Sequence, residues 1–140
     1  MKKVMFVGET RVGKSSLIRA LSGEEYTSHR AMAVEYVGRF VNTPGEFLEN
    51  SWFYNALITT SADCDMLVFV QDATRGSSLF PPLFAPIFNR RVVGVVSKVD
   101  APEAEVARAE RFLNNAGARD IVYASVVTGE GLDTLAEMIG

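Results

Sequence analysis

The sequence has little of several features that define whole classes of protein. Its 140 residues include one cysteine, Cys64, so no disulfide can form within the chain and a disulfide-bonded secreted scaffold is excluded. No apolar run approaches the roughly 20 residues that span a bilayer. The first apolar run stops at Gly8, which makes it too short for the core of a signal peptide. We therefore expect a cytoplasmic protein without a membrane span.

An excess of positive charge is also missing. The chain has 14 Lys and Arg against 17 Asp and Glu, which gives a net charge of −3. Proteins that bind nucleic acid through its phosphates are usually basic, so we expect no nucleic-acid partner. What remains is ordinary globular composition, with 48% hydrophobic and 22% charged residues. The length suits a single core, and we predict one domain over residues 1–140.

Continuous apolar runs alternate with segments of helical spacing. The runs predict strands that are buried on both faces, at residues 4–7, 66–70, 92–96 and 121–123. Apolar residues spaced by three and four predict helices around residues 17–21, 53–60, 106–116 and 132–139. Residues 34–41 hold two short β-like pieces, which predict a hairpin. The alternation predicts an α/β fold with a mainly parallel sheet, covered on both faces, and one antiparallel edge strand.

The segment from Gly8 to Ser15 matches the phosphate-binding pattern GxxxxGK[ST]. It follows a predicted buried strand and opens a helix, so its backbone N–H groups can surround a β-phosphate. We predict that Lys14 bridges the β- and γ-phosphates and acts in catalysis, and that the Ser15 hydroxyl binds Mg²⁺. The alternative is a tight strand-to-helix turn with a solvated lysine. The predicted nucleotide-binding residues of this loop are Gly8, Arg11, Val12, Gly13, Lys14, Ser15 and Ser16.

A second segment, Asn42–Glu46, follows the predicted hairpin. Triphosphatases with such a loop carry D-x-x-G here, in which the Asp serves the Mg²⁺ shell and the Gly senses the γ-phosphate. We assign Asn42 to the metal, although an amide lacks the negative charge of Asp. We assign Gly45 to the nucleotide and Glu46 to catalysis. The alternatives are a simple turn and, for Glu46, a favourable charge at the start of the helix containing Trp52.

Two later segments fit recognition of a guanine base. Lys98 and Asp100 belong to an [NTS]KxD pattern at the end of a predicted parallel strand, where ligands bind in open sheets. Asp100 would accept hydrogen bonds from the base, and Lys98 would lay its stem over it. The loop after the last strand resembles S-A-x-T-G-x-G, whose backbone at Ser125 and Val126 would contact the guanine carbonyl. The alternatives are an ordinary loop and, for Asp100, the cap of a helix starting near Pro102.

Four such segments in this order identify the chain as a guanine-nucleotide-binding domain of the Ras-like class. That resemblance implies GTP or GDP with Mg²⁺. It also implies a Ras-like P-loop fold, a three-layer α/β/α sandwich around a mainly parallel six-stranded sheet with one antiparallel edge strand. Three further segments, AVEY at 33–36, NTPGEF at 42–47 and WFYNALITT at 52–60, resemble the EutP/PduV family of bacterial ethanolamine- and propanediol-utilisation proteins.

The family resemblance implies association with bacterial microcompartments and leaves three activities open. The first is slow Mg²⁺-dependent GTP hydrolysis, and the second is a nucleotide-dependent acetate kinase. The third is a non-catalytic, nucleotide-bound localisation or scaffold module. The family pattern places a threonine near Ala31, where none is present, although Thr27 and Ser28 are nearby. Together with Asn42, this departure predicts weak metal binding and slow hydrolysis.

Several other residues allow a functional or a purely structural interpretation. Arg11 and Arg30 could act as internal arginine fingers or be simple solvated cations. The single histidine, His29, is expected to be solvated, and Cys64 to be inert core. The uncharged segment Phe80–Phe88 has too many prolines for a long helix. It either covers the core or exposes an apolar surface for a shell protein or a second copy of the chain.

Overall fold

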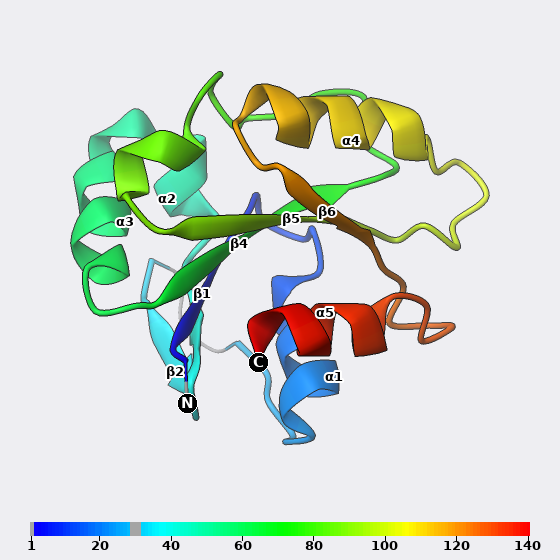
Figure 1. The fold of residues 1–140 in the computed structure, drawn as a ribbon, viewed down its shortest axis with the longest axis horizontal. Coiled ribbons are helices and arrows are strands. Elements are labelled where there is room, and N and C mark those ends of the chain that lie inside the picture. Colours follow the sequence, from blue (N-terminus) through cyan, green and yellow to red (C-terminus); the bar gives the residue numbers. More distant parts are fainter. Residues whose placement is uncertain (1, 29–31) are drawn as a thin grey trace.

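The computed structural model describes residues 2–28 and 32–140 (Figure 1). The strands are β1 (Val4–Val7), β2 (Glu35–Val37), β3 (Phe40–Asn42), β4 (Met66–Asp72), β5 (Arg91–Ser97) and β6 (Asp120–Tyr123). The α-helices are α1 (Lys14–Ser22), α2 (Glu46–Glu49), α3 (Tyr54–Ser61), α4 (Val106–Asn115) and α5 (Leu132–Ile139). Two 3₁₀ turns are η1 (Ser51–Phe53) and η2 (Ala85–Phe88).

The strands form one six-stranded sheet in the order β2-β3-β1-β4-β5-β6. All neighbouring strands are parallel except β2 and β3, which form the antiparallel hairpin at one edge. Strands β1 and β4 are buried along their whole length, as continuous apolar runs predict for the middle of a parallel sheet. The predicted mainly parallel sheet with one antiparallel edge strand is confirmed.

Helices cover both faces of the sheet, as Figure 1 shows. On one face lie α1 and α5, whose Leu17, Ile18, Leu135 and Ile139 are buried in one apolar cluster. On the other face lie α2, α3 and α4, with Leu57 and Leu113 buried in a second cluster. The predicted three-layer α/β/α sandwich is therefore confirmed. Among the described residues, no helix has the length and apolar character needed to cross a bilayer.

The Phe80–Phe88 segment covers the core. Phe80, Phe84 and Phe88 are all buried, and their rings surround Phe69 of β4 at centroid distances of 4.7, 5.8 and 6.0 Å. The prolines leave only the short turn η2 as regular structure in this segment. The interpretation that these phenylalanines form an exposed surface for a shell protein or a second copy is therefore wrong, because burial in the same chain leaves none of the rings available.

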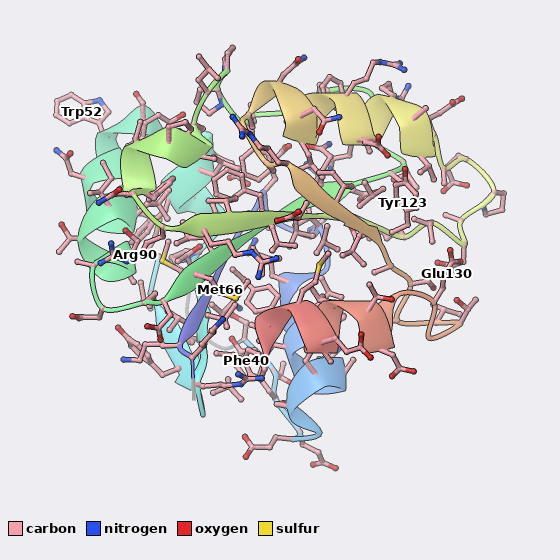
Figure 2. All side chains as sticks on the ribbon, in the orientation of Figure 1. Phe40, Trp52, Met66, Arg90, Tyr123 and Glu130 are labelled. Carbon is pink, nitrogen blue, oxygen red and sulfur yellow. The ribbon has the colours of Figure 1, made fainter. Side chains whose placement is uncertain are left out.

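Two predicted helix starts are also corrected. Helix α4 begins at Val106 and not near Pro102, so Asp100 is not its cap. Glu46 opens α2, a single turn of its own, whereas Trp52 lies in η1. Trp52 is 88% exposed, and Figure 2 shows its ring standing away from the body of the molecule.

The parallel strands fix the place where a ligand can bind. Strands β1, β3, β4, β5 and β6 run parallel, so their carboxyl ends lie side by side along one border of the sheet, called here the carboxyl edge. The four motif segments follow β1, β3, β5 and β6, so the fold gathers them at that edge.

Candidate functional site

A cavity of about 570 Å³ opens at the carboxyl edge of the sheet. Its lining comes from the loop after β1, the start of α1, the segment after β3, strand β2 and the end of β5. The predicted site residues in this lining are Arg11, Gly13, Lys14, Ser15, Ser16, Asn42, Gly45, Glu46 and Lys98. The structure thus brings three of the four motif segments to one cavity. The predicted residues outside the lining are Gly8, Val12, Asp100, Ser125 and Val126.

Close backbone packing shapes the loop between β1 and α1. A side chain at Gly8 would place its Cβ 2.8 Å from the carbonyl oxygen of Val70, so only glycine fits there. Gly13 takes a left-handed conformation with φ 104°, which turns the chain into α1. The Val12 side chain is buried, and its carbonyl accepts a hydrogen bond of 2.7 Å from Ser97 Oγ of β5. The loop is therefore packed against β4 at Gly8 and hydrogen-bonded to β5 at Val12.

Lys14 is the buried cation of the cavity. It is 7% exposed, and its Nζ donates to the carbonyls of Gly8 at 2.6 Å and Glu9 at 2.9 Å. Burial lowers the pKa of Lys14 to about 8, although nearby carboxylates, first Glu49 and then Glu46, partly offset the effect. At neutral pH the ammonium group remains charged and is already held inside the loop.

Sequence reasoning missed the contacts that brace the loop from outside. Arg75 donates from Nη1 to Glu9 Oε1 at 2.7 Å and from Nη2 to the carbonyl of Thr10 at 2.7 Å. On the other side, Glu49 Oε2 accepts a hydrogen bond of 2.8 Å from the Thr10 N–H. These partners lie far from the loop in sequence, and no local motif marks them.

Asn42 lies beside Ser15, as its place in the motif predicts. Its Nδ2 donates to Ser15 Oγ at 3.2 Å and to Tyr26 Oη at 2.9 Å. Its Oδ1 is buried and has no hydrogen-bond partner among residues 2–28 and 32–140. Mg²⁺ prefers oxygen ligands, so a turn of the amide that exchanges Nδ2 for the unsatisfied Oδ1 would place two oxygens, Oδ1 and the Ser15 hydroxyl, side by side. These residues therefore fit the metal that the motif implies.

A carboxylate that sequence reasoning did not assign also lines this part of the cavity. Glu35 of β2 accepts hydrogen bonds at Oε1 from Tyr26 Oη and Ser28 Oγ, each at 2.6 Å. Burial, together with the carboxylate of Glu35, raises the pKa of Tyr26, so its hydroxyl remains a donor at neutral pH. The only sequence signal for Glu35 was the AVEY segment at 33–36, which contains it. The predictions for His29, Arg30 and Ala31 lie outside the described residues.

The segment after β3 packs directly on the phosphate loop. Gly45 is buried, and a Cβ there would lie 2.3 Å from the backbone nitrogen of Thr10. Glycine is therefore required by this approach of two loops. Glu46 follows as the first residue of α2, is half-buried and lines the cavity. Its carboxylate contributes to the charge balance of Lys14.

The segments predicted to recognise the base lie next to each other after the carboxyl ends of the neighbouring strands β5 and β6. Lys98 Nζ donates to the Arg11 carbonyl at 2.8 Å and to Asp72 Oδ2 at 2.9 Å, which ties β4, β5 and the phosphate loop together. Asp100 is exposed and accepts a hydrogen bond of 2.8 Å from Ser125 Oγ. Ser125 is buried, whereas Val126 is 43% exposed. Figure 2 marks the loop that contains them by its label on Glu130.

Comparisons with known proteins agree with this geometry. The family model described as "Ethanolamine utilisation - propanediol utilisation" matches residues 1–140. The chain is 32% identical to the "Propanediol utilization protein PduV" of Citrobacter freundii, over 96% of this chain and 91% of that protein. It is 35% identical to the "Probable acetate kinase EutP" of Escherichia coli (strain K12), over 88% of this chain and 79% of that protein.

A comparison with solved structures bears on the fold alone. The FeoB G-domain from Methanococcus jannaschii superposes with a TM-score of 0.68. The match covers 99% of this chain and 94% of that chain at 20% identity. The sheet and its helices are therefore those of a G-domain, the Ras-like fold predicted from the motifs.

Proposed function

The chain belongs to the PduV-EutP family, and from that premise we propose that it binds a guanine nucleotide with Mg²⁺ and hydrolyses GTP slowly. The observation that carries this proposal is the cavity at the carboxyl edge of the sheet, where Lys14, Ser15 and Asn42 meet on one wall. A buried ammonium group beside the start of a helix is an arrangement suited to a polyphosphate.

The phosphate loop supplies binding and charge neutralisation. In the proposed complex, Lys14 exchanges the carbonyls of Gly8 and Glu9 for oxygens of the β- and γ-phosphates. The backbone N–H groups at the start of α1 face the β-phosphate. Arg11, Gly13 and Ser16 line the cavity that holds it. Val12 and Gly8 act indirectly, because they hold the loop against β5 and β4.

Ser15 would hold Mg²⁺ through its hydroxyl, and Asn42 through Oδ1 after its amide turns to face the ion. Bound there, the ion would supply positive charge to the β- and γ-phosphate oxygens. Because neither residue is a carboxylate, we expect weaker metal binding than at a site with an aspartate in place of Asn42.

Hydrolysis needs little covalent chemistry from the protein. Water attacks the γ-phosphorus, the bond from that phosphorus to the β–γ bridging oxygen breaks, and GDP leaves with that oxygen. Lys14 stabilises the negative charge that develops on the leaving group. Glu46 is proposed to accept a hydrogen bond from the attacking water, and the N–H of Gly45 to contact the γ-phosphate.

We assign the choice of base to four residues that follow β5 and β6, namely Lys98, Asp100, Ser125 and Val126. Asp100 accepts hydrogen bonds from the guanine ring N1–H and its 2-amino group, whereas adenine has neither a hydrogen on N1 nor an amine at C2. Lys98 covers the base with its stem, and the backbone at Ser125 and Val126 contacts the guanine carbonyl. The bond between Ser125 Oγ and Asp100 fixes that carboxylate before the base arrives.

Phosphate release from GTP tests the hydrolytic part of the proposal. Purified protein should release phosphate slowly with GTP and Mg²⁺, and the rate should fall to background in Lys14→Ala. A rate that is identical in the two proteins would identify a contaminant as the source and would contradict the assignment. Tight GTP binding without any turnover would instead support a nucleotide-bound localisation or scaffold module.

A second candidate function is transfer of phosphate from a nucleotide to acetate. The specific observation that favours it is the 35% identity to a protein named a probable acetate kinase. In this reaction an acetate oxygen attacks the γ-phosphorus and the diphosphate leaves, giving acetyl phosphate. Exposed Arg11, at the cavity, offers a cation for the acetate carboxylate. Trapping acetyl phosphate as the hydroxamate, with and without acetate, separates this reaction from hydrolysis.

We also propose that the protein acts at bacterial microcompartments, as the family's link to ethanolamine and propanediol utilisation suggests. With Phe80, Phe84 and Phe88 buried, any contact with a shell protein must use other residues. Co-sedimentation with assembled shells would test this location. Recovery of the protein only in the unbound fraction would contradict it.

A further inference from the structure

The negative charge that Asn42 lacks is present directly across the hairpin. Glu35 of β2 is the register partner of Asn42 of β3, so the two side chains lie on the same face of an antiparallel pair. Both residues line the same cavity as Ser15. We propose that Glu35 supplies the carboxylate of the Mg²⁺ site, as an outer ligand that accepts a hydrogen bond from metal-bound water. This inference rests on the proposed nucleotide-binding function.

An unbroken chain of hydrogen bonds connects the Glu35 carboxylate to the Ser15 hydroxyl, which is the proposed Mg²⁺ ligand. Ser15 Oγ accepts from Asn42 Nδ2 at 3.2 Å, and the same nitrogen donates to Tyr26 Oη at 2.9 Å. Tyr26 Oη in turn donates to Glu35 Oε1 at 2.6 Å. Because Mg²⁺ usually keeps several of its waters, a carboxylate one water away from the ion still contributes to its binding.

The orientation of Glu35 is fixed from two directions. Tyr26 and Ser28 both donate to its Oε1, which holds the carboxylate at the cavity wall. Tyr26 also accepts from the amide of Asn42, so one tyrosine positions both members of the register pair. Loss of an outer ligand that is held in this way typically lowers metal affinity by roughly 10-fold to 100-fold.

The other acidic residue of the cavity serves a different part of it. Among the described lining residues, only Glu35 and Glu46 carry negative charge. Glu46 lies at the start of α2 and acts on Lys14, whose pKa its charge raises. Glu35 is joined to the Ser15 hydroxyl through Tyr26 and Asn42. The two carboxylates therefore separate into one that faces the γ-phosphate end and one that faces the metal.

The test compares nucleotide affinity with Mg²⁺ and with EDTA by calorimetry. In Glu35→Gln, which keeps the size of the side chain and an acceptor for Tyr26 and Ser28, the gain in GTP affinity due to Mg²⁺ should fall by roughly 10-fold to 100-fold. Affinity in EDTA should stay near that of the unaltered protein. Glu46→Gln is the matched control, since it removes the same charge from the same cavity, and it should leave the Mg²⁺-dependent gain intact.

A second readout comes from restoring a carboxylate at Asn42 of β3, the register partner of Glu35. The double variant Glu35→Gln with Asn42→Asp should regain the Mg²⁺ dependence, and thermal unfolding should verify that each variant is folded. An unchanged Mg²⁺ dependence in Glu35→Gln, or an equal loss in Glu46→Gln, would overturn the role of Glu35 alone. Absence of GTP binding by the unaltered protein in both buffers would overturn the proposed function, and the metal role with it.

Discussion

The two ends of the proposed nucleotide site are built in different ways. At the phosphate end, Lys14 is buried and its ammonium group is already bound to two carbonyls of the loop. At the base end, Asp100 is exposed and is held by one hydrogen bond from Ser125. The phosphate end is thus buried and held by several contacts of the loop, whereas the base end is exposed and its carboxylate is held by a single hydrogen bond. Changes at the first should affect all nucleotides equally, and changes at the second should affect the choice among them.

The largest effect is expected from Lys14→Ala. Loss of two charge-assisted hydrogen bonds, at about 1.5 kcal/mol each, should weaken GTP and ATP alike by about 100-fold. Calorimetry measures both affinities. Lys2→Ala, which removes an exposed lysine outside the cavity, should leave them unchanged. A loss confined to GTP would contradict the view that this end does not distinguish bases.

Asp100→Asn should have a smaller and selective effect. Loss of one charge-assisted hydrogen bond of about 1.5 kcal/mol weakens GTP by about tenfold. Binding of ATP should not change, and xanthosine triphosphate should bind better than it does to the unaltered protein, because its ring offers a matching pattern to an amide. Equal losses for GTP and ATP in a competition assay would place Asp100 outside base recognition.

Raising the pH should weaken phosphate binding through Lys14. The pKa of this residue in the free protein is lowered to about 8, and the proposed triphosphate complex requires the protonated form. Above that pH, deprotonation of the free protein competes with binding, so GTP affinity should fall about fivefold between pH 8 and pH 9. Between pH 8 and pH 7 affinity should rise about twofold more, and below pH 7 the residue is almost fully protonated and imposes little further change. Lys14→Ala should show no such fall, and if it shows the same one, another group is responsible.

The smallest effect is expected from Ser125→Ala. The Ser125 hydroxyl orients Asp100 and also accepts from the N–H groups of Val127 and Thr128. The Asp100 carboxylate itself stays in place, so the loss of the bond that orients it, at about 0.5 kcal/mol, should weaken GTP about twofold and leave ATP unchanged. A loss larger than that in Asp100→Asn would mean that the loop, and not the carboxylate, determines base choice.

The phosphate end was predictable because its determinants are contiguous. Residues 8–16 form one strand-to-helix turn, so their spacing alone brings Gly13, Lys14 and Ser15 together. The meeting of Asn42 with Ser15 also followed from the sequence, because parallel strands β1 and β3 end at the same edge. Glu35, Tyr26 and Arg75 were missed because their roles depend on strand register and on contacts between distant loops.

Errors arose where local signals allow more than one backbone path. Pro102 suits a turn as well as the first turn of a helix, and the chain makes a turn there before α4 begins at Val106. Phe80, Phe84 and Phe88 are spaced by four, as on one face of a helix, but the prolines between them exclude a regular helix, so this spacing was not used to say which residues face the core. The structure buries Phe84 and leaves Leu83 68% exposed.

One titration tests the central claim most directly. Purified protein is titrated with GTP, GDP, ATP and ADP in a calorimeter, each with Mg²⁺ and with EDTA. The account predicts that both guanine nucleotides bind at least about tenfold more tightly than their adenine counterparts, a difference of about 1.4 kcal/mol, and that Mg²⁺ strengthens GTP binding. Equal affinity for ATP and GTP would contradict the guanine assignment and favour transfer of phosphate from ATP to acetate.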